Sequence, residues 1–132
     1  KNDGLWSSLR TSVGRNDDTN QGYIYSEFIN TLRMNSWMAT NFSSKYFFSG
    51  GDSFGALGIS KYINLSDNIL IIPELNVQLS KESESNKTIS LRYSYSPSRS
   101  MDIYYSNAIG IQDIGQNLKG QDKLGIKLNF NY

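Results

Sequence analysis

The carboxyl-terminal stretch Lys123–Tyr132 restricts the fold most, because its apolar side chains occur at strictly alternating positions. The even-numbered positions carry the apolar or aromatic residues Leu124, Ile126, Leu128, Phe130 and Tyr132, and Lys, Gly or Asn fill the positions between them. Successive side chains of a β-strand point to opposite faces. The stretch therefore predicts a strand with one apolar face and one polar face, a pattern that half-buried strands of soluble proteins share.

The same alternation recurs along the 132 residues and predicts a single all-β domain. Seven further strands are predicted, at Gly4–Gly14, Gly22–Arg33, Trp37–Phe48, Phe54–Ile63, Ile69–Leu79, Thr88–Tyr95 and Met101–Ile111. Gly22–Arg33 also fits helical spacing, but its Tyr, Ile and Thr content favours a strand. The predicted connections alternate between long loops and short turns, with the medium-length Ser49–Ser53 as the exception.

One face of these strands is apolar and free of Lys, Arg, Asp and Glu in seven of the eight segments. We assign to it Leu5, Leu9, Val13, Ile24, Phe28, Leu32, Met38, Phe42, Ile69, Ile71, Leu75, Val77, Ile89, Leu91, Tyr93, Ile103, Ile109, Leu124, Ile126, Leu128 and Phe130. For Phe54–Ile63 both registers are open. We prefer the one that turns Phe54, Ala56, Gly58, Ser60 and Tyr62 outward, because it keeps Lys61 inside.

The terminal stretch resembles the last strand of bacterial outer-membrane β-barrels, which typically ends on an aromatic residue after alternating apolar positions. Ser106–Gln116 also resembles carboxyl-terminal barrel segments of cyanobacterial outer-membrane proteins. The resemblance implies an antiparallel up-and-down barrel, eight-stranded and transmembrane, in the outer membrane of a Gram-negative bacterium. It also implies that Leu124, Ile126, Leu128, Phe130 and Tyr132 form an assembly signal, with outer-membrane lipid and the barrel-assembly machinery as partners.

The opposite face collects charged side chains, which an eight-stranded barrel would enclose in a lumen just wide enough to be filled by side chains. We expect these charges to pair in a structural lumen network, with a proton or ion path as the alternative. The network residues are Arg10, Glu27, Arg33, Glu74, Arg92, Asp102, Lys123 and Lys127, and Lys45 lies on the same face. Glu74 and Arg92 are expected to be cross-strand partners, because they lie at similar distances on either side of the loop Lys81–Lys87.

Composition argues against catalysis, metal binding and nucleic-acid binding. The chain has no His and no Cys, which removes the commonest general base and the usual ligands of transition metals. The net charge of +1 comes without a basic cluster, and the acidic segment Asn16–Asp18 lacks the spacing of a calcium loop. No apolar run approaches 18 residues, the length a transmembrane helix requires. We therefore expect no enzyme activity, no cofactor and no metal.

The function expected is a non-enzymatic outer-membrane barrel that serves as a membrane anchor, a structural barrel or a small channel. A first alternative is the carboxyl-terminal part of a larger porin-like transport barrel. A second alternative is a soluble lipocalin-like barrel that binds a small apolar ligand, which Pro73 and the low mean hydropathy favour. The hydrophilic start at Lys1 leaves open a further domain of the same protein, or neighbouring barrels, as partners.

Overall fold

All eight predicted strands are present, including the ambiguous segment Gly22–Arg33. The computed structural model describes residues 4–16, 20–79, 85–108 and 119–130. Its elements are β1 (Leu5–Asn16), β2 (Gln21–Arg33), β3 (Met38–Ser49), β4 (Asp52–Asn64), β5 (Ile69–Leu79), β6 (Ser85–Ser96), β7 (Arg99–Ala108) and β8 (Lys119–Phe130). In this part of the chain no helix is long and apolar enough to span a membrane. The predicted end of the seventh strand at Ile111, like Ile109 and Tyr132, lies outside the described residues.

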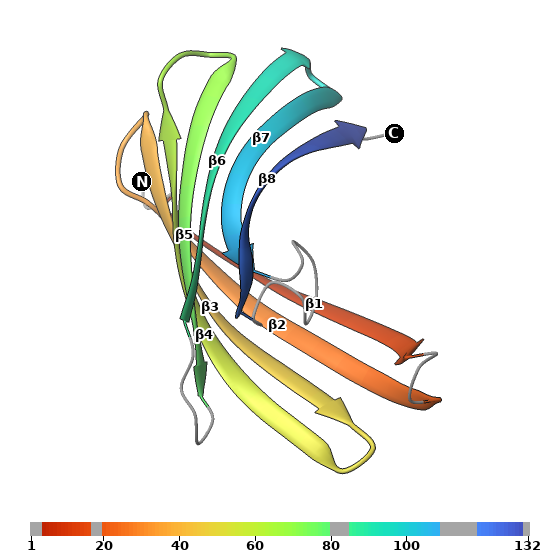
Figure 1. The fold of residues 1–132 in the computed structure, drawn as a ribbon. Coiled ribbons are helices and arrows are strands. Elements are labelled where there is room, and N and C mark those ends of the chain that lie inside the picture. The colour runs from red at the N-terminus through yellow and green to blue at the C-terminus, as the bar shows by residue number, and fades with distance from the viewer. Residues whose placement is uncertain (1–3, 17–19, 80–84, 109–118, 131–132) are drawn as a thin grey trace.

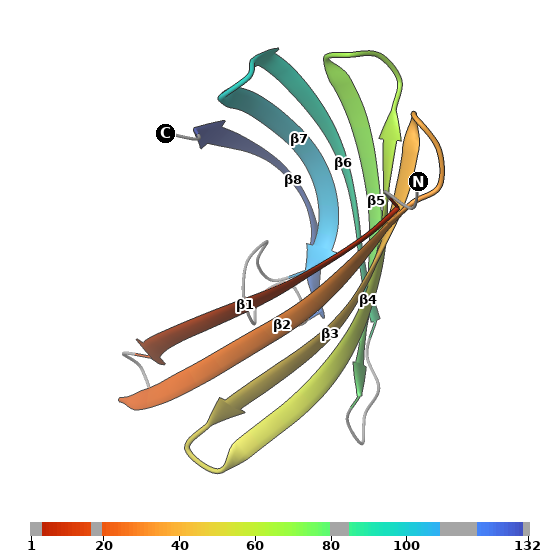
Figure 2. The ribbon, with the colours of Figure 1, turned by 180° about the vertical axis from the view of Figure 1, so that it is seen from behind.

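The strands form one antiparallel sheet in which each strand pairs with its neighbours in the sequence, in the order β1-β2-β3-β4-β5-β6-β7-β8. Figure 1 and Figure 2 show the sheet strongly curled, with a convex and a concave face. β1 and β8 lie at the two edges and are not paired with each other, and the N and C ends lie on opposite sides in both views. The described strands thus make an open half-barrel, whereas the sequence had predicted a closed one.

Tight turns and glycine–tyrosine contacts shape the hairpins. β3 and β4 are joined by Gly50 and Gly51 alone, with φ of 55° and 108°, so the medium-length loop predicted here is a two-residue turn. Such positive φ angles suit the turns that match the twist of antiparallel strands. In the polar row of β8, Gly125 lies opposite Tyr104, whose ring occupies the space of a side chain at that position.

The core lies on the concave face. Tyr25 of β2 is fully buried there, and Ala56 and Ala108 are buried as well. Most of the other buried side chains are polar or charged, among them Asn76 and Asn86. Long apolar side chains are instead exposed on the convex face, which reverses the usual arrangement of a soluble domain.

Pro73 lies in β5, a central strand of the sheet. Because proline has no backbone N–H, it cannot donate to a neighbouring strand. The ladder between β4 and β5 runs as far as Ser60↔Glu74 and resumes at Ile63↔Ile71 with an unchanged register. On the other side Pro73 stays paired with Ile89. The sheet therefore accommodates the proline through a local gap in one ladder.

Candidate functional site

The concave face carries a charge belt, which we define as Arg10, Glu27, Lys45 and Glu74. The strand register places Arg10 opposite Glu27 and Glu27 opposite Lys45, so three neighbouring strands present charges of alternating sign. Arg10 Nη1 lies 3.9 Å from Glu27 Oε2, and Lys45 Nζ lies 3.5 Å from Glu27 Oε1. Lys45 Nζ also lies 3.7 Å from Glu74 Oε1, which extends the belt to β5. The belt therefore joins four strands of the sheet through ion pairs.

Lys45 is the centre of the charge belt, because its side chain is only 1% exposed. Its ammonium donates a hydrogen bond of 2.5 Å to Asn76 Oδ1. Asn76 Nδ2 in turn donates to Glu74 Oε1 at 2.7 Å and lies 3.4 Å from Asn86 Oδ1. A buried ammonium is tolerated only when anions and acceptors surround it. The two carboxylates and the buried amide meet that requirement.

Gly58 makes room for this cluster. A Cβ atom at Gly58 would lie 2.4 Å from Ser43 Oγ and 2.6 Å from Asn76 Oδ1, so no larger residue fits without rearrangement. Gly58 and the buried Ala56 must therefore face the concave side. As a consequence Lys61 lies on the convex side, and the outward register that we predicted for Phe54–Ile63 is wrong. The crowding around Lys45 outweighs the cost of turning one lysine outward.

A second group of charges lies across β6, β7 and β8. Arg92 and Asp102 form a bidentate ion pair, with Nε–Oδ1 and Nη2–Oδ2 distances of 2.7 and 2.8 Å. Lys127 of β8 lies opposite Asp102, so the sign again alternates from strand to strand. The predicted pairing of Glu74 with Arg92 is wrong. β6 begins at Ser85, which places Thr88 opposite Glu74 and Leu70 opposite Arg92.

Two residues of the predicted lumen network lie outside both groups. Arg33 is exposed near the end of β2, where its Nε donates to the carbonyl oxygen of Asn35 at 3.2 Å. Lys123 lies opposite Ser106, on the concave side of β8. The predicted network is therefore two separate ion-pair groups with additional cations near the strand ends.

Sequence reasoning missed the buried amides Asn76 and Asn86, which lie opposite each other in β5 and β6. Asn76 lies between Glu74 and Gln78 on the polar face of β5, and its place beside a charged residue on that face was the available signal. Buried amides need partners, and one atom of this pair, Asn86 Nδ2, has none among the described residues. The same holds for Asn41 Oδ1, on the concave side of β3.

The chemistry of the concave face is that of paired charge rather than of a reactive centre. Within the described ranges, no cluster of three or more His, Cys, Asp or Glu side chains could hold a metal ion. A cavity of about 110 Å³ beside Lys45 is lined by Glu27, Asn41 and Glu74. Its volume suits a few water molecules.

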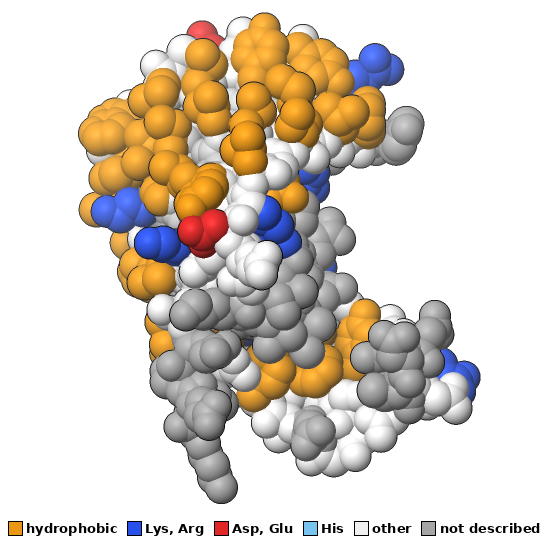
Figure 3. Space-filling view, viewed as in Figure 1, with side chains coloured by type: hydrophobic (Ala, Val, Ile, Leu, Met, Phe, Trp, Pro, Cys, Tyr) orange, Lys and Arg blue, Asp and Glu red, His pale blue; other side chains and the backbone are white. Residues whose placement is uncertain are grey.

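The convex face carries a continuous apolar surface, which Figure 3 shows over the upper parts of β5 to β8. Apart from the segment Phe54–Ile63, the predicted outward residues for which the structure describes side chains lie on this face, including Leu124, Ile126, Leu128 and Phe130 of the predicted assembly signal. Among the described residues its charged side chains are Arg15, Lys61, Lys87, Arg99 and Asp122. Four of them flank the apolar stretches of their strands, whereas Lys61 lies between Ile59 and Ile63 within the apolar stretch of β4.

The apolar surface crosses the sheet diagonally. One row of cross-strand neighbours on the convex face runs from Leu5 in β1 through Leu32 in β2 to Leu124 in β8, and its members in β3 and β4 are Thr40 and Lys61. Leu5 lies near the end of β1 that is next to the short turns. Leu124, in contrast, lies near the end of β8 that is next to the long loops. The strands are therefore tilted relative to the apolar band, as barrel strands are relative to the barrel axis.

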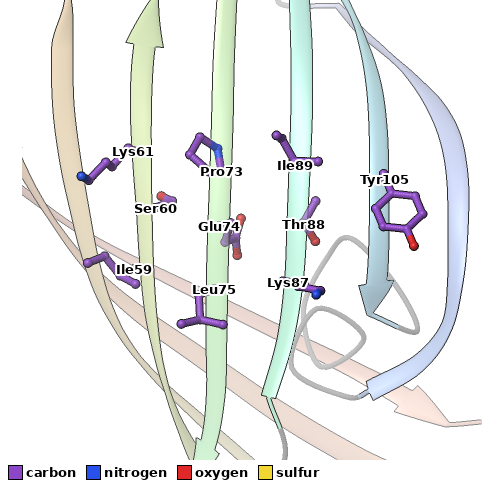
Figure 4. A pocket seen from close by; sticks show the side chains of 10 residues that line it. All are labelled: Ile59, Ser60, Lys61, Pro73, Glu74, Leu75, Lys87, Thr88, Ile89 and Tyr105. Atoms are coloured by element: carbon purple, nitrogen blue, oxygen red, sulfur yellow. The ribbon is translucent and has the colours of Figure 1, made fainter.

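A groove of about 470 Å³ interrupts the convex face around Pro73. In Figure 4, Ile59, Leu75 and Ile89 surround the proline, and Lys61 and Lys87 point away from each other at opposite sides of the groove. The two ammonium groups therefore do not converge on one position.

The two edge strands expose their apolar side chains more than the inner strands do. Val13 of β1 is 76% exposed and Leu124 of β8 is 75% exposed, whereas Leu91 and Ile103 of the inner strands β6 and β7 are 44% and 40% exposed. The difference arises because each edge strand has a neighbour on one side only.

No protein-family model, curated protein or solved structure matches this chain.

Proposed function

We propose that the chain forms the wall of a non-enzymatic β-barrel in a bacterial outer membrane. Its convex face contacts lipid and its concave face lines the lumen. The observation that carries the proposal is the diagonal apolar band of the convex face, which is free of charge in seven of the eight strands and carries one lysine, Lys61, in β4. A lysine or arginine on the lipid face at the middle of a bilayer costs about 2–4 kcal/mol. A surface selected for contact with water would have no reason to exclude charge from such a band.

The concave face supports the same proposal. Its buried side chains include Glu27, Lys45, Asn76 and Asp102, which pair with one another or with neighbouring polar groups. A lipocalin-like protein would place apolar side chains on this face and charges on the convex one. The paired charges fit a structural lumen lining better than an ion path, because the buried ammonium of Lys45 already has three partners.

A specific observation favours the porin-like alternative over a closed eight-stranded barrel. The eight described strands curl through only part of a barrel, and β1 and β8 remain at open edges. We therefore favour a role as the last strands of a wider, porin-like barrel. In that barrel β8 would act as the assembly signal recognised by the barrel-assembly machinery, through Leu124, Ile126, Leu128 and Phe130.

Dependence on lipid tests the proposal. We expect the purified chain to precipitate when detergent is removed, and to float with lipid vesicles through a density gradient when vesicles are present during removal. It should stay with the vesicles after an alkaline wash, which strips peripheral proteins. A chain that remains a monomer in solution without detergent or lipid would refute the membrane proposal and favour the lipocalin-like one.

A further inference from the structure

We propose that the groove around Pro73 binds an anionic phospholipid, with an acyl chain in the groove and the phosphate beside the ammonium of Lys61. The inference rests on the proposed function, since it requires the convex face to lie in lipid, and it assigns one specific lipid contact to that face. The occupant is defined by its chemistry, a negatively charged phosphate carried on an apolar chain. It would come from the leaflet on the side of the short turns, which outer-membrane barrels place toward the periplasm.

The first step is the charge of Lys61, which the rest of the convex face leaves without a counter-ion. Lys61 is exposed between Ile59 and Ile63, within the apolar stretch of β4. It forms no ion pair with any residue that the structure describes. Within the described ranges this face carries one carboxylate, Asp122 in β8, which accepts a hydrogen bond of 2.7 Å from the hydroxyl of Tyr105. A lipid-facing lysine is costly, and a phosphate forms strong charge-assisted hydrogen bonds with an ammonium. A lipid phosphate is therefore the anion that can lower the cost of Lys61.

The second step is the groove itself, which has the size and the lining of a site for an apolar chain. Its volume of about 470 Å³ lies within the range of about 300–1,000 Å³ that is usual for small-ligand sites. In Figure 4, Ile59, Leu75 and Ile89 surround Pro73, and Lys61 extends away from the proline at the rim. The ammonium therefore lies beside the groove and leaves its apolar floor free for an acyl chain.

The third step is the direction of the groove across the sheet. Lys61, Pro73 and Ile89 belong to the row of cross-strand neighbours that crosses the convex face from the short-turn side at β1 to the long-loop side at β8. Lys61 lies three residues before Asn64, the last residue of β4, so its long side chain can extend to the interface on the short-turn side. From there the groove leads deeper into the membrane as it crosses β5 and β6. A lipid with its phosphate at Lys61 and its chain along the groove therefore has the orientation of a phospholipid in that leaflet.

Lys87 lies at the opposite side of the groove and is a poorer site for a phosphate. It lies near the start of β6, on the side of the long loops. Tyr105, which lines the groove on the neighbouring strand β7, holds the carboxylate of Asp122 through its hydroxyl. That carboxylate would repel a phosphate at this side. Around Lys61, in contrast, the described convex positions of β3, β4 and β5 carry no carboxylate.

Lipids with bromine on the acyl chain test the site, because bromine quenches only a tryptophan that lies close to it. Leu57→Trp places a reporter on the convex face of β4 near the groove, in a chain whose own tryptophans are replaced by Trp6→Phe and Trp37→Phe. In mixed vesicles, brominated phosphatidylglycerol should bind next to the reporter about fivefold better than brominated phosphatidylcholine, the gain typical of one lysine at an anionic membrane surface.

Variants of the two lysines separate the position of the charge from its mere presence. Lys61→Met should abolish the preference for phosphatidylglycerol, whereas Lys61→Arg and the matched control Lys87→Met should keep it. Equal quenching by the two lipids, or a preference that Lys61→Met leaves unchanged, would overturn the inference. Weak quenching by both lipids in a chain that floats would show that protein covers the groove, and would overturn it as well.

A second measurement uses the stability of the folded chain. In vesicles of phosphatidylcholine alone, Lys61→Met should be more stable than the native chain, because this lipid brings no net negative charge to offset the lysine. A ligand that binds only the folded state stabilises it, so phosphatidylglycerol should narrow this difference. A difference that is the same in both kinds of vesicle would contradict the inference. Failure of the chain to float with vesicles would refute the proposed function as well, whereas flotation without a lipid preference refutes this inference alone.

Discussion

Replacing Lys45 by Met tests the charge belt most sharply, because the ammonium holds two carboxylates on neighbouring strands. At 3.5 Å from Glu27 and 3.7 Å from Glu74, each Coulomb attraction amounts to about 4–5 kcal/mol at an effective dielectric constant of about 20. Desolvation of the buried groups offsets much of this attraction. Removal of one member of a buried ion pair costs about 3–5 kcal/mol, since the remaining charge stays buried without a counter-ion. Glu27 keeps Arg10 as a counter-ion at 3.9 Å, so we expect Lys45→Met to lower the free energy of unfolding by about 3 kcal/mol, the lower end of that range.

The assay is urea unfolding of the chain in lipid vesicles, followed by tryptophan fluorescence. The matched control combines Lys45→Met with Glu27→Gln and Glu74→Gln, which removes the uncompensated charges together with the ammonium. Replacing a whole buried ionic group by neutral residues is often close to neutral in stability, so the triple variant should recover most of the loss. A single variant that loses less than about 1 kcal/mol would refute the belt as a stabilising element, since an orphaned buried charge costs more than that.

Three further predictions concern the two faces of the sheet, and each is read as the free energy of unfolding in vesicles. Leu91→Lys, in the middle of the apolar band, should lower it by about 2–4 kcal/mol, and an unchanged value would argue against lipid contact at that position. Lys61→Met should raise it by about 2–4 kcal/mol, because Lys61 lies between Ile59 and Ile63 within the apolar band, where a lipid-facing lysine is costly. Gly125→Ala should lower it by about 1 kcal/mol, since the new Cβ would lie 2.3 Å from Tyr104 Cζ and displace the ring; a gain in stability would contradict that packing.

The strands and the sorting of side chains between the two faces were predictable from the sequence. Strict alternation in segments such as Ile69–Leu79 and Lys123–Tyr132 reports a periodicity that the backbone imposes. The segment Gly22–Arg33 fits helical spacing as well, yet its β-branched and aromatic residues predicted the strand correctly. The alternation of apolar and polar residues was therefore sufficient to predict the properties that depend on one strand alone.

Properties that depend on two strands were not predictable in the same way. The register of Phe54–Ile63 follows from Gly58, which leaves room for Lys45 and Asn76 on other strands. The expected pairing of Glu74 with Arg92 is wrong because the β5–β6 hairpin is not centred on the predicted loop Lys81–Lys87, and Glu74 lies opposite Thr88 instead. Whether the sheet closes depends on the curvature summed over all eight strands, and the sequence of a single strand does not predict that sum.

Lipid contact along β6 tests the central claim most directly, because its convex and concave residues alternate one by one. Spin labels placed singly from Thr88 to Tyr93 would report their access to oxygen, which concentrates in the bilayer, and to a water-soluble nickel complex. The account predicts a period of two, with oxygen access highest at Ile89, Leu91 and Tyr93 and nickel access highest at the residues between them. Uniform access, or the reverse alternation, would contradict a lipid-facing convex surface.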